Sequence, residues 1–405
     1  MKDLVVLKKH LILFSLLSIL LFSEDELKNL LSSDQNQLLE YQKEQNKVQS
    51  DKLEKAWINP VLLEYSKNYT TQFGTTINTG QFVVSVNQPI FKMGGIWSAI
   101  KYAKAQGAAN NLDIELQKRE LISKALNILY NLKQSAYKIK KLDLLIANDN
   151  IDIQIQKESY EQGLSNRTLY DQALLKHNQD VTSRLELELS IVKLKNDFSL
   201  LSNINPYELT LPHFGMMDRQ RYIQEQLELK RDSLRVEEKR HNRYMTLTKY
   251  MPEVSVTGKY TDEDLNPLFS FPGSSLQTKY YNYGFKVTLP LNVNSFDDIQ
   301  SSKIEYMNAK IALDEKKKTV LNNFKLITKR LEIIDKKIVL SKEDAVHYQS
   351  MLQTAEDLES LGDKTSLDTQ IVANNVLVRQ LDQEIYKIDA QLELLGLYVN
   401  VADAL

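Results

Sequence analysis

The chain has 405 residues, of which 42% are hydrophobic and 26% are charged, so it is long enough for one large or two ordinary domains. Its formal net charge is −2 and no block of basic residues occurs, so nothing in the composition points to a nucleic-acid partner. Cysteine is absent, which excludes disulfides, thiolate metal sites, a cysteine nucleophile and a lipid-modified cysteine.

Residues 1–23 are predicted to be an export signal. Two lysines precede an apolar run from Leu11 to Phe22, and acidic residues follow it. A helix of this length spans about 18 Å, too short for a bilayer core of about 30 Å, so a cleaved secretory signal fits better than a membrane helix. A buried N-terminal helix is the alternative. Residues 24–58 are then predicted to form a periplasmic helix.

Residues 59–205 are predicted to form a first repeat of two strands and a long helical hairpin. The stretches "NPVLLEYSKNYTTQF" and "GQFVVSVNQPIF" alternate like strands on either side of the polar connector "GTTINTG". From Gly95 to Tyr160 the pattern is helical without a stop signal, which predicts a helix of about 100 Å. Its seam steps by four and three residues, as in a coiled coil: Leu121, Ala125, Ile128, Leu132, Ser135, Ile139, Leu142 and Ile146.

Residues 206–220 are predicted to be a linker, and residues 221–405 a second repeat with a helix, two strands and another long helical hairpin. The second long helix has its own seam: Phe324, Ile327, Leu331, Ile334, Ile338, Ser341, Ala345 and Tyr348. Pro89 and Pro290 lie 201 residues apart, and Gly163 and Gly362 lie 199 residues apart. These offsets, with the same order of elements in each half, indicate an internal duplication of about 200 residues.

The four predicted strands have about ten residues each, the length of a tilted strand that crosses a membrane. The last strand has an apolar face from Tyr281 to Leu289 and a polar face opposite. A soluble sheet packed on a core would alternate in the same way, and the export signal favours the membrane. Four strands cannot close a barrel, and open edges are not tolerated in lipid. Strands from several copies of the chain must therefore combine in one closed barrel. We predict a homotrimer with one 12-stranded barrel, because two copies would give a filled interior.

Polar residues of these strands are candidates for the barrel lumen: Asn87, Lys259, Asn282 and Lys286. The two lysines could equally be anchors at the membrane interface. For this reason the sequence does not predict an ion selectivity from them.

These motifs resemble the TolC-like outer-membrane efflux protein family, the outer membrane factors. The likeness covers nearly the whole mature chain and rests on short motifs in duplicated order: "QPIFKMGG" at the first strand-to-helix junction, its partner "TLPLNV", the strand entry "MPEVSV", and the turns "YEQGLSNRTLYDQA" and "LESLGDKTSLDTQ". The resemblance implies a mainly α-helical trimer, with a 12-stranded β-barrel in the outer membrane that continues into a long periplasmic α-helical coiled-coil barrel.

The resemblance also implies an exit duct without chemistry or cofactors, which serves a tripartite efflux or type I secretion system. Its partners would be its own copies, a periplasmic adaptor, an inner-membrane transporter and outer-membrane lipid. No nucleophile, acid–base pair, phosphate loop or metal-ligand spacing emerges from the sequence, so we expect no enzyme. A periplasmic adaptor and a secreted coiled-coil scaffold are the alternatives, but neither calls for two hairpins with paired strands.

At the strand-to-helix junctions, Pro89, Gly94, Gly95 and Pro290 are expected to let the backbone swing from strand to helix. The family's helix-to-helix turns lie at the periplasmic end and form a gate. Gly362 then matches the turn glycine of the second repeat.

Within the implied gate, Lys364 matches a basic gate residue and Asp368 the first carboxylate of a ring around the pore. The family's efflux archetype has a second acid where this chain has Ile371, and Asp363 has no clear counterpart, so a double ring is in doubt. Three copies of Asp368 at a constriction would disfavour anions and attract cations.

Simpler structural roles compete with the gate. Thr365-x-x-Asp368 also spells an N-terminal capping pattern, and Thr168-x-x-Asp171 repeats it in the first half. Gly163 and Gly362 could be left-handed helix C-caps, a role that is compatible with adaptor docking in the grooves beside them.

Overall fold

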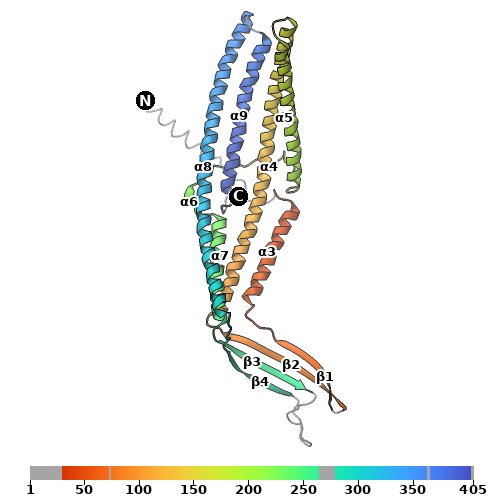
Figure 1. Ribbon diagram of the computed structural model, residues 1–405, viewed down its shortest axis with the longest axis vertical. Coiled ribbons are helices and arrows are strands. Elements are labelled where there is room, and N and C mark those ends of the chain that lie inside the picture. The colour runs from red at the N-terminus through yellow and green to blue at the C-terminus, as the bar shows by residue number, and fades with distance from the viewer. Residues whose placement is uncertain (1–29, 73, 264–278, 363–364, 403–405) are drawn as a thin grey trace, which may run out of the picture. The chain divides into compact units, whose positions relative to one another are not determined.

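The computed structural model describes residues 30–72, 74–263, 279–362 and 365–402. The predicted signal at residues 1–23 and the predicted gate residues Asp363 and Lys364 lie outside these ranges. Figure 1 shows the elements, which in chain order are α3 (Ser33–Glu54), β1 (Leu62–Gln72), β2 (Thr75–Phe91), α4 (Gly95–Glu161), α5 (Arg167–Ser199), α6 (Arg219–Gln224), α7 (Leu227–Lys249), β3 (Glu253–Glu263), β4 (Lys279–Thr288), α8 (Ser295–Leu361) and α9 (Ser366–Tyr398). Over the described residues, no helix is both long enough and apolar enough to span a bilayer.

The lengths of the helices follow the predicted duplication. α4 and α8 have 67 residues each, and α5 and α9 have 33 residues each. α4 begins at Gly95 and α8 at Ser295, which are 200 residues apart. A shorter helix also precedes each pair of strands, α3 before β1 and α7 before β3. The two predicted long helices are confirmed, and the division into a first repeat, a linker and a second repeat stays a prediction.

The chain folds into two compact units, each of which combines segments of both predicted repeats. The helical unit comprises Met1–Glu40, Glu115–Leu227 and Lys318–Leu405, within which the described residues form α5, α6, α9 and the later parts of α4 and α8. The sheet unit comprises Tyr41–Ile114 and Glu228–Lys317, with the four strands, α7, most of α3 and the first parts of α4 and α8.

In the helical unit, four helices run side by side in the order α8, α9, α4, α5 (Figure 1). Every predicted seam residue of α8 from Phe324 to Tyr348 is buried or half-buried, whereas all residues between them except Thr328 are exposed. None of the eight predicted seam positions of α4 is exposed. The coiled-coil seams read from the four-three spacing are therefore the packed faces of these helices.

A segment of the predicted linker is bound across α4 and α9 within the helical unit. The ring of Phe214 lies 6.4 Å from that of Tyr130 and 4.9 Å from that of Tyr398. The side chain of Gln391 bonds both the backbone N–H and the carbonyl of Phe214, at 2.7 and 3.1 Å. Tyr130 donates its hydroxyl proton to the carbonyl of Pro212, and burial raises the pKa of this phenol. The linker is thus a packed part of this unit.

In the sheet unit, α3 and α7 both pack on α4. The side chain of Asn46 on α3 bonds the carbonyl of Gly107 at 2.8 Å. On α7, Arg231 and Arg235 both bond the carboxylate of Asp113, at 3.0 and 2.8 Å. These polar contacts hold α3 and α7 against the first part of α4.

The four strands form one antiparallel sheet in the order β1-β2-β3-β4. β2 has 17 residues and begins at Thr75, so most of the predicted connector "GTTINTG" is part of the strand. That prediction was wrong because Gly74, with φ +82°, lies in the turn, and the residues after it pair with β1. The predicted connector between the last two strands lies almost entirely outside the described residues.

Candidate functional site

One face of the sheet is mainly apolar, and we call it the aromatic face, although Gln88 and Asp262 lie on the same side. Because the register places its apolar residues opposite one another on neighbouring strands, their side chains share one side of the sheet. They are Leu63 and Tyr65 on β1, Phe82, Val84 and Val86 on β2, Val254, Val256 and Tyr260 on β3, and Tyr281, Tyr283, Phe285 and Val287 on β4. The side chain of Tyr283 is 90% exposed, so this face is not covered by the rest of the chain there.

The opposite side, the polar face, carries all four predicted lumen residues. Lys259 lies between Ser85 and Asn282 in the register, and Lys286 pairs with Ser255. Asn87 has the same parity as Ser85 and therefore shares their face. Carboxylates are present as well, including Glu64 opposite Val83, and Glu253, which forms a 3.0 Å ion pair with Lys92. The polar face thus carries both signs of charge.

The two outer strands each have one edge without a described partner. β1 pairs only with β2, and β4 pairs only with β3. Every second N–H and C=O group along such an edge points away from the sheet and requires a hydrogen-bond partner wherever water is excluded.

At the junction of β2 and α4, the backbone changes direction through two consecutive left-handed residues. Met93 has φ +44° and Gly94 has φ +82°. A Cβ atom on Gly95 would lie 2.5 Å from the hydroxyl of Thr248, so only glycine fits there. Pro89 adjoins an irregularity in the pairing of β2 with β3, whereas Pro290 follows the end of β4. The role of Met93 was missed, because nothing in the sequence marks it as left-handed.

The predicted C-caps at the ends of α4 and α8 are present. Gly163 has φ +73° and Gly362 has φ +82°. The Gly163 N–H bonds the carbonyl of Tyr160 at 3.0 Å, and the N–H of Leu164 bonds that of Ser159 at 2.9 Å, which together form a Schellman motif. The chain therefore turns sharply between α4 and α5.

At the start of α9, Asp368 takes part in the predicted capping box. Thr365 is the N-cap, its hydroxyl accepts from the N–H of Asp368 at 3.3 Å, and it donates to Oδ2 of Asp368 at 2.8 Å. The same Oδ2 accepts the backbone N–H of Thr365 at 3.4 Å. Asp368 is thus a structural residue of this turn, whatever else it does.

The corresponding capping prediction for α5 was wrong by two residues. The N-cap is Asn166, whose side-chain oxygen accepts from the N–H of Leu169 at 3.2 Å. Thr168 lies inside the helix, and Asp171 forms a 3.5 Å ion pair with Arg167. The 199-residue offset that relates Gly163 to Gly362 also relates Asn166 to Thr365, so the two helices begin at equivalent positions with different capping residues.

A ladder of polar contacts joins α4 to α9. The ladder has three rungs: Gln134–Asp389 at 2.6 Å, Lys141–Asp382 at 2.6 Å and Asn148–Asn375 at 3.3 Å. Successive rungs are seven residues apart on both helices, and one member of each rung is buried. Sequence reasoning missed this ladder, although the shared heptad spacing of polar residues on two antiparallel helices is a usable signal.

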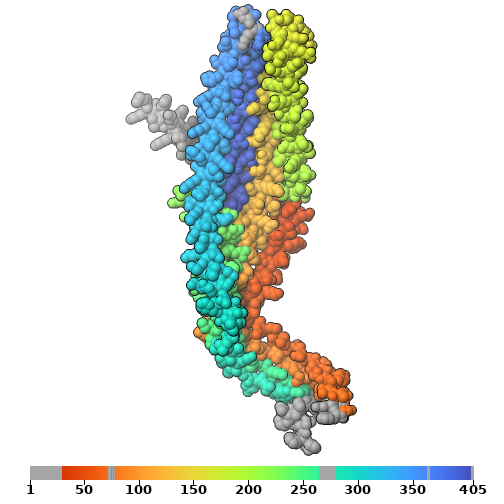
Figure 2. All heavy atoms as spheres, viewed as in Figure 1, coloured from red at the N-terminus to blue at the C-terminus, as the bar shows by residue number. Residues whose placement is uncertain are grey.

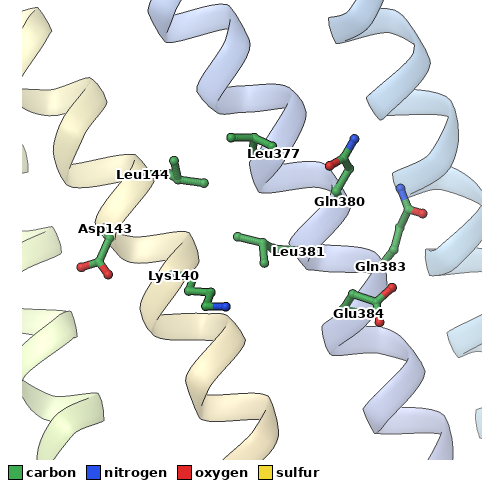
Figure 3. Close-up of a pocket in the computed structure, with 8 residues that line it drawn as sticks. All are labelled: Lys140, Asp143, Leu144, Leu377, Gln380, Leu381, Gln383 and Glu384. Atoms are coloured by element: carbon green, nitrogen blue, oxygen red, sulfur yellow. The ribbon is translucent and has the colours of Figure 1, made fainter.

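A groove of about 720 Å³ lies between the same two helices (Figure 3). Leu144 of α4 faces Leu377 and Leu381 of α9, and polar side chains lie around these leucines. Leu377 is 46% exposed. The groove could accommodate an apolar side chain of a partner, and α4 and α9 are the two inner helices of the four-helix layer.

α5 and α8, the two outer helices, lie at the margins of that layer in Figure 2. Both carry rows of exposed apolar residues. On α8, Leu326, Ile333 and Leu340 are exposed at seven-residue spacing. On α5, exposed apolar residues recur as well: Leu175, Leu185, Leu189 and Val192. Both rows have the spacing of coiled-coil seams without a described partner helix.

Among the described residues, no cluster of acidic or histidine side chains has the arrangement of a metal site. The described residues instead form surfaces that a partner could contact: an aromatic face, a polar face, open strand edges and apolar helix margins.

Comparison with known proteins identifies related families and folds. The model of the outer membrane efflux protein family matches residues 60–191. A comparison with curated proteins found no match.

Solved structures with the same fold have low sequence identity to this chain. The outer membrane protein VceC of Vibrio cholerae is 14% identical with a TM-score of 0.71, over 90% of this chain and 93% of VceC. The CmeC outer membrane channel of Campylobacter jejuni is 14% identical with a TM-score of 0.69, over 92% of this chain and 84% of CmeC. The open state of the MtrE outer membrane channel of Neisseria gonorrhoeae is 11% identical with a TM-score of 0.62, over 91% of this chain and 87% of MtrE.

The resemblance inferred from the sequence is therefore confirmed, both by the family model and by the fold. The predicted fold class is confirmed for the single chain, which has long helices and a small sheet like those of outer-membrane channels. The matched proteins are described as outer membrane efflux proteins and outer membrane channels, the class and location that the sequence predicted.

Proposed function

We propose that the chain is the outer-membrane exit duct of a tripartite efflux or type I secretion system. The observation that carries this proposal is the sheet, which combines an aromatic face, a polar face and two open edges. In lipid, an aromatic face is favourable on the outside of a barrel and a polar face on the inside. Open edges are not tolerated there, so further strands must pair with β1 and β4.

Three copies of the chain satisfy these edges while leaving a lumen. If β4 of each copy pairs with β1 of the next, three four-stranded sheets close into a barrel of 12 strands. Two copies would give eight strands, whose interior is filled by side chains. The exposed apolar rows on α5 and α8 support the same assembly, because they would meet between neighbouring copies in the helical part.

The duct would conduct substrates passively, driven by partners in the periplasm and the inner membrane. We place the contact with a periplasmic adaptor at the helix turns around Gly163 and Gly362. Thr168 and Asp171 lie at the start of α5, and Thr365 is the N-cap of α9. The groove at Leu377 offers a further surface for an adaptor helix. The inner-membrane transporter would supply the cargo.

At the same turns, Asp368 is the proposed carboxylate of a periplasmic gate, with Asp363 and Lys364 next to it in the chain. Both capping bonds of the Asp368 carboxylate fall on one oxygen, Oδ2, so capping leaves the other oxygen for ions. Three such carboxylates around a three-fold axis would attract cations.

Purification in mild detergent and reconstitution test this proposal. The chain should fractionate with outer membranes, have the mass of three subunits in native mass spectrometry and form conducting pores in planar bilayers. A monomeric mass together with an absence of conductance would overturn it. The cysteine-free chain also allows a single cysteine near Gly362 to be crosslinked to an adaptor protein.

A further inference from the structure

A buried carboxylate of α4 faces α5 in the helical unit. The side chain of Asp149 is 1% exposed. Its Oδ1 accepts a hydrogen bond from the ammonium group of Lys176 on α5. Its Oδ2 is buried and has no hydrogen-bond partner among the described residues. An unsatisfied carboxylate oxygen in such a position is costly, so the missing donor needs an explanation.

The missing donor can come from a second carboxyl group. Lys176 and Asp180 are four residues apart on α5, so both lie on the side of that helix that faces Asp149. Asp180 also interacts electrostatically with Asp149, so the two carboxyl groups lie near each other. Two ionised carboxylates are both hydrogen-bond acceptors, whereas a protonated Asp180 can donate a hydrogen bond to Asp149.

Around the pair, negative charges outnumber positive ones, which also favours a bound proton. Lys176 supplies one positive charge against the two carboxyl groups, and Asp152 on α4 also acts on Lys176. His177 on α5 acts on Asp180 and opposes protonation. On the α9 side, the neighbouring Asn148 meets only the neutral amides of two asparagines. Burial first, and then the neighbouring carboxylate of Asp149, raise the pKa of Asp180 above its ordinary value.

We propose that Asp149 and Asp180 share one proton and so form a proton-binding site between α4 and α5. With the proton in place, Asp149 Oδ2 has a donor and the cluster with Lys176 is neutral. When the proton leaves, a second negative charge appears beside a buried carboxylate and repels it. The contact between the two helices of this hairpin therefore weakens as the pH rises.

The sign of the effect follows from the direction of the pKa shift. An aspartate has a pKa of about 3.9 in the unfolded chain, and the folded value for Asp180 is higher. The stabilisation is complete below the unfolded value and is lost as the pH rises through the folded value. The loss should therefore fall above the pH range in which ordinary aspartates titrate.

The test compares the thermal unfolding of three forms of the full chain in detergent between about pH 4 and about pH 8. In Asp180→Asn, a neutral amide donor replaces the protonated carboxyl at every pH, so the wild-type midpoint should fall relative to this variant as the pH rises. Asp152→Asn removes a neighbouring carboxylate from outside the pair. Its unfolding midpoint should fall with rising pH as that of the wild type does. Equal pH profiles for wild type and Asp180→Asn would overturn the proposal.

A second measurement does not depend on the stability of the variant. Infrared spectra of the wild-type protein should be recorded at a pH above the range in which ordinary aspartates titrate. At that pH they should still show the carbonyl band of a protonated carboxylic acid. Asp180→Glu should shift this band, and Asp152→Asn should leave it unchanged. A wild-type spectrum without the band would also overturn the proposal.

Discussion

The ammonium group of Lys141 on α4 lies 2.6 Å from the carboxylate of Asp382 on α9, in the middle rung of the polar ladder. The side chain of Asp382 is only 6% exposed, and its other carboxylate oxygen is held by Arg379 at 3.2 Å. This pair therefore places a charge inside the helix–helix contact, where the loss of one partner leaves the other incompletely satisfied.

The first prediction concerns that pair. Lys141→Met should lower the free energy of unfolding by about 1–3 kcal/mol, because Asp382 stays buried with one donor fewer. Thermal or urea unfolding of the purified protein measures the change. The adjacent Lys140→Met is the matched control, since Lys140 is exposed and should change stability by less than about 0.5 kcal/mol. Equal effects of both changes would contradict a stabilising role of the ladder.

The second prediction concerns the turn glycine of the first hairpin. Gly163→Ala should destabilise the turn by about 1–2 kcal/mol, because a residue with a Cβ atom is strained at φ +73°. Nothing lies within 4 Å of the added atom, so the cost is conformational rather than steric. Hydrogen exchange of the Leu164 amide should become faster. Gly215→Ala, without a left-handed φ or a close contact, is the control, and unchanged exchange in Gly163→Ala would speak against the cap.

The third prediction separates the two faces of the sheet. Tyr283→Lys places a charge on the aromatic face and should cost about 2–4 kcal/mol if that face contacts lipid. Asn282→Glu places a charge on the next residue and the opposite face, across from Lys259, and should be tolerated. The fraction of folded, protease-resistant protein in outer membranes measures both. Similar yields for the two variants would argue against a lipid-facing aromatic face.

The fourth prediction separates capping from gating at the start of α9. Asp368→Asn keeps a capping oxygen but removes the charge, so it should lower the preference for cations over anions in bilayer recordings. Thr365→Ala keeps the charge but removes the cap, so it should cost about 1 kcal/mol of helix stability and leave ion preference unchanged. If Asp368→Asn conducts ions as the wild type does, Asp368 is a capping residue only.

Much of the architecture could be predicted from the sequence because it depends on local periodicity. The seam from Phe324 to Tyr348 specifies a helix and its buried face without reference to any other segment. Gly163 and Gly362 mark the ends of helices because glycine adopts left-handed φ at little cost. The alternation from Tyr281 to Val287 predicted one apolar face of a strand, since side chains of a strand alternate whatever it pairs with.

The predictions that failed concerned segments in which the residue types fit two structures equally well. "GTTINTG" contains two glycines and a polar run typical of a loop, but pairing with β1 makes most of it strand. Thr168 and Asn166 are both good N-caps by residue type. Asn166 is the N-cap because the preceding turn ends there and the helix begins at Arg167.

The sequence by itself determined the two long helices, their seams, their glycine turns and the alternation of the strands, because each follows from the repeat of side chains along one segment. The tertiary structure alone decided that Asn87, Lys259, Asn282 and Lys286 share one face, that three polar rungs join α4 to α9, and that the buried Asp149 meets Lys176. The physical reason is that register and helix pairing bring together residues far apart in the chain, and no local pattern records which partner a polar side chain will meet.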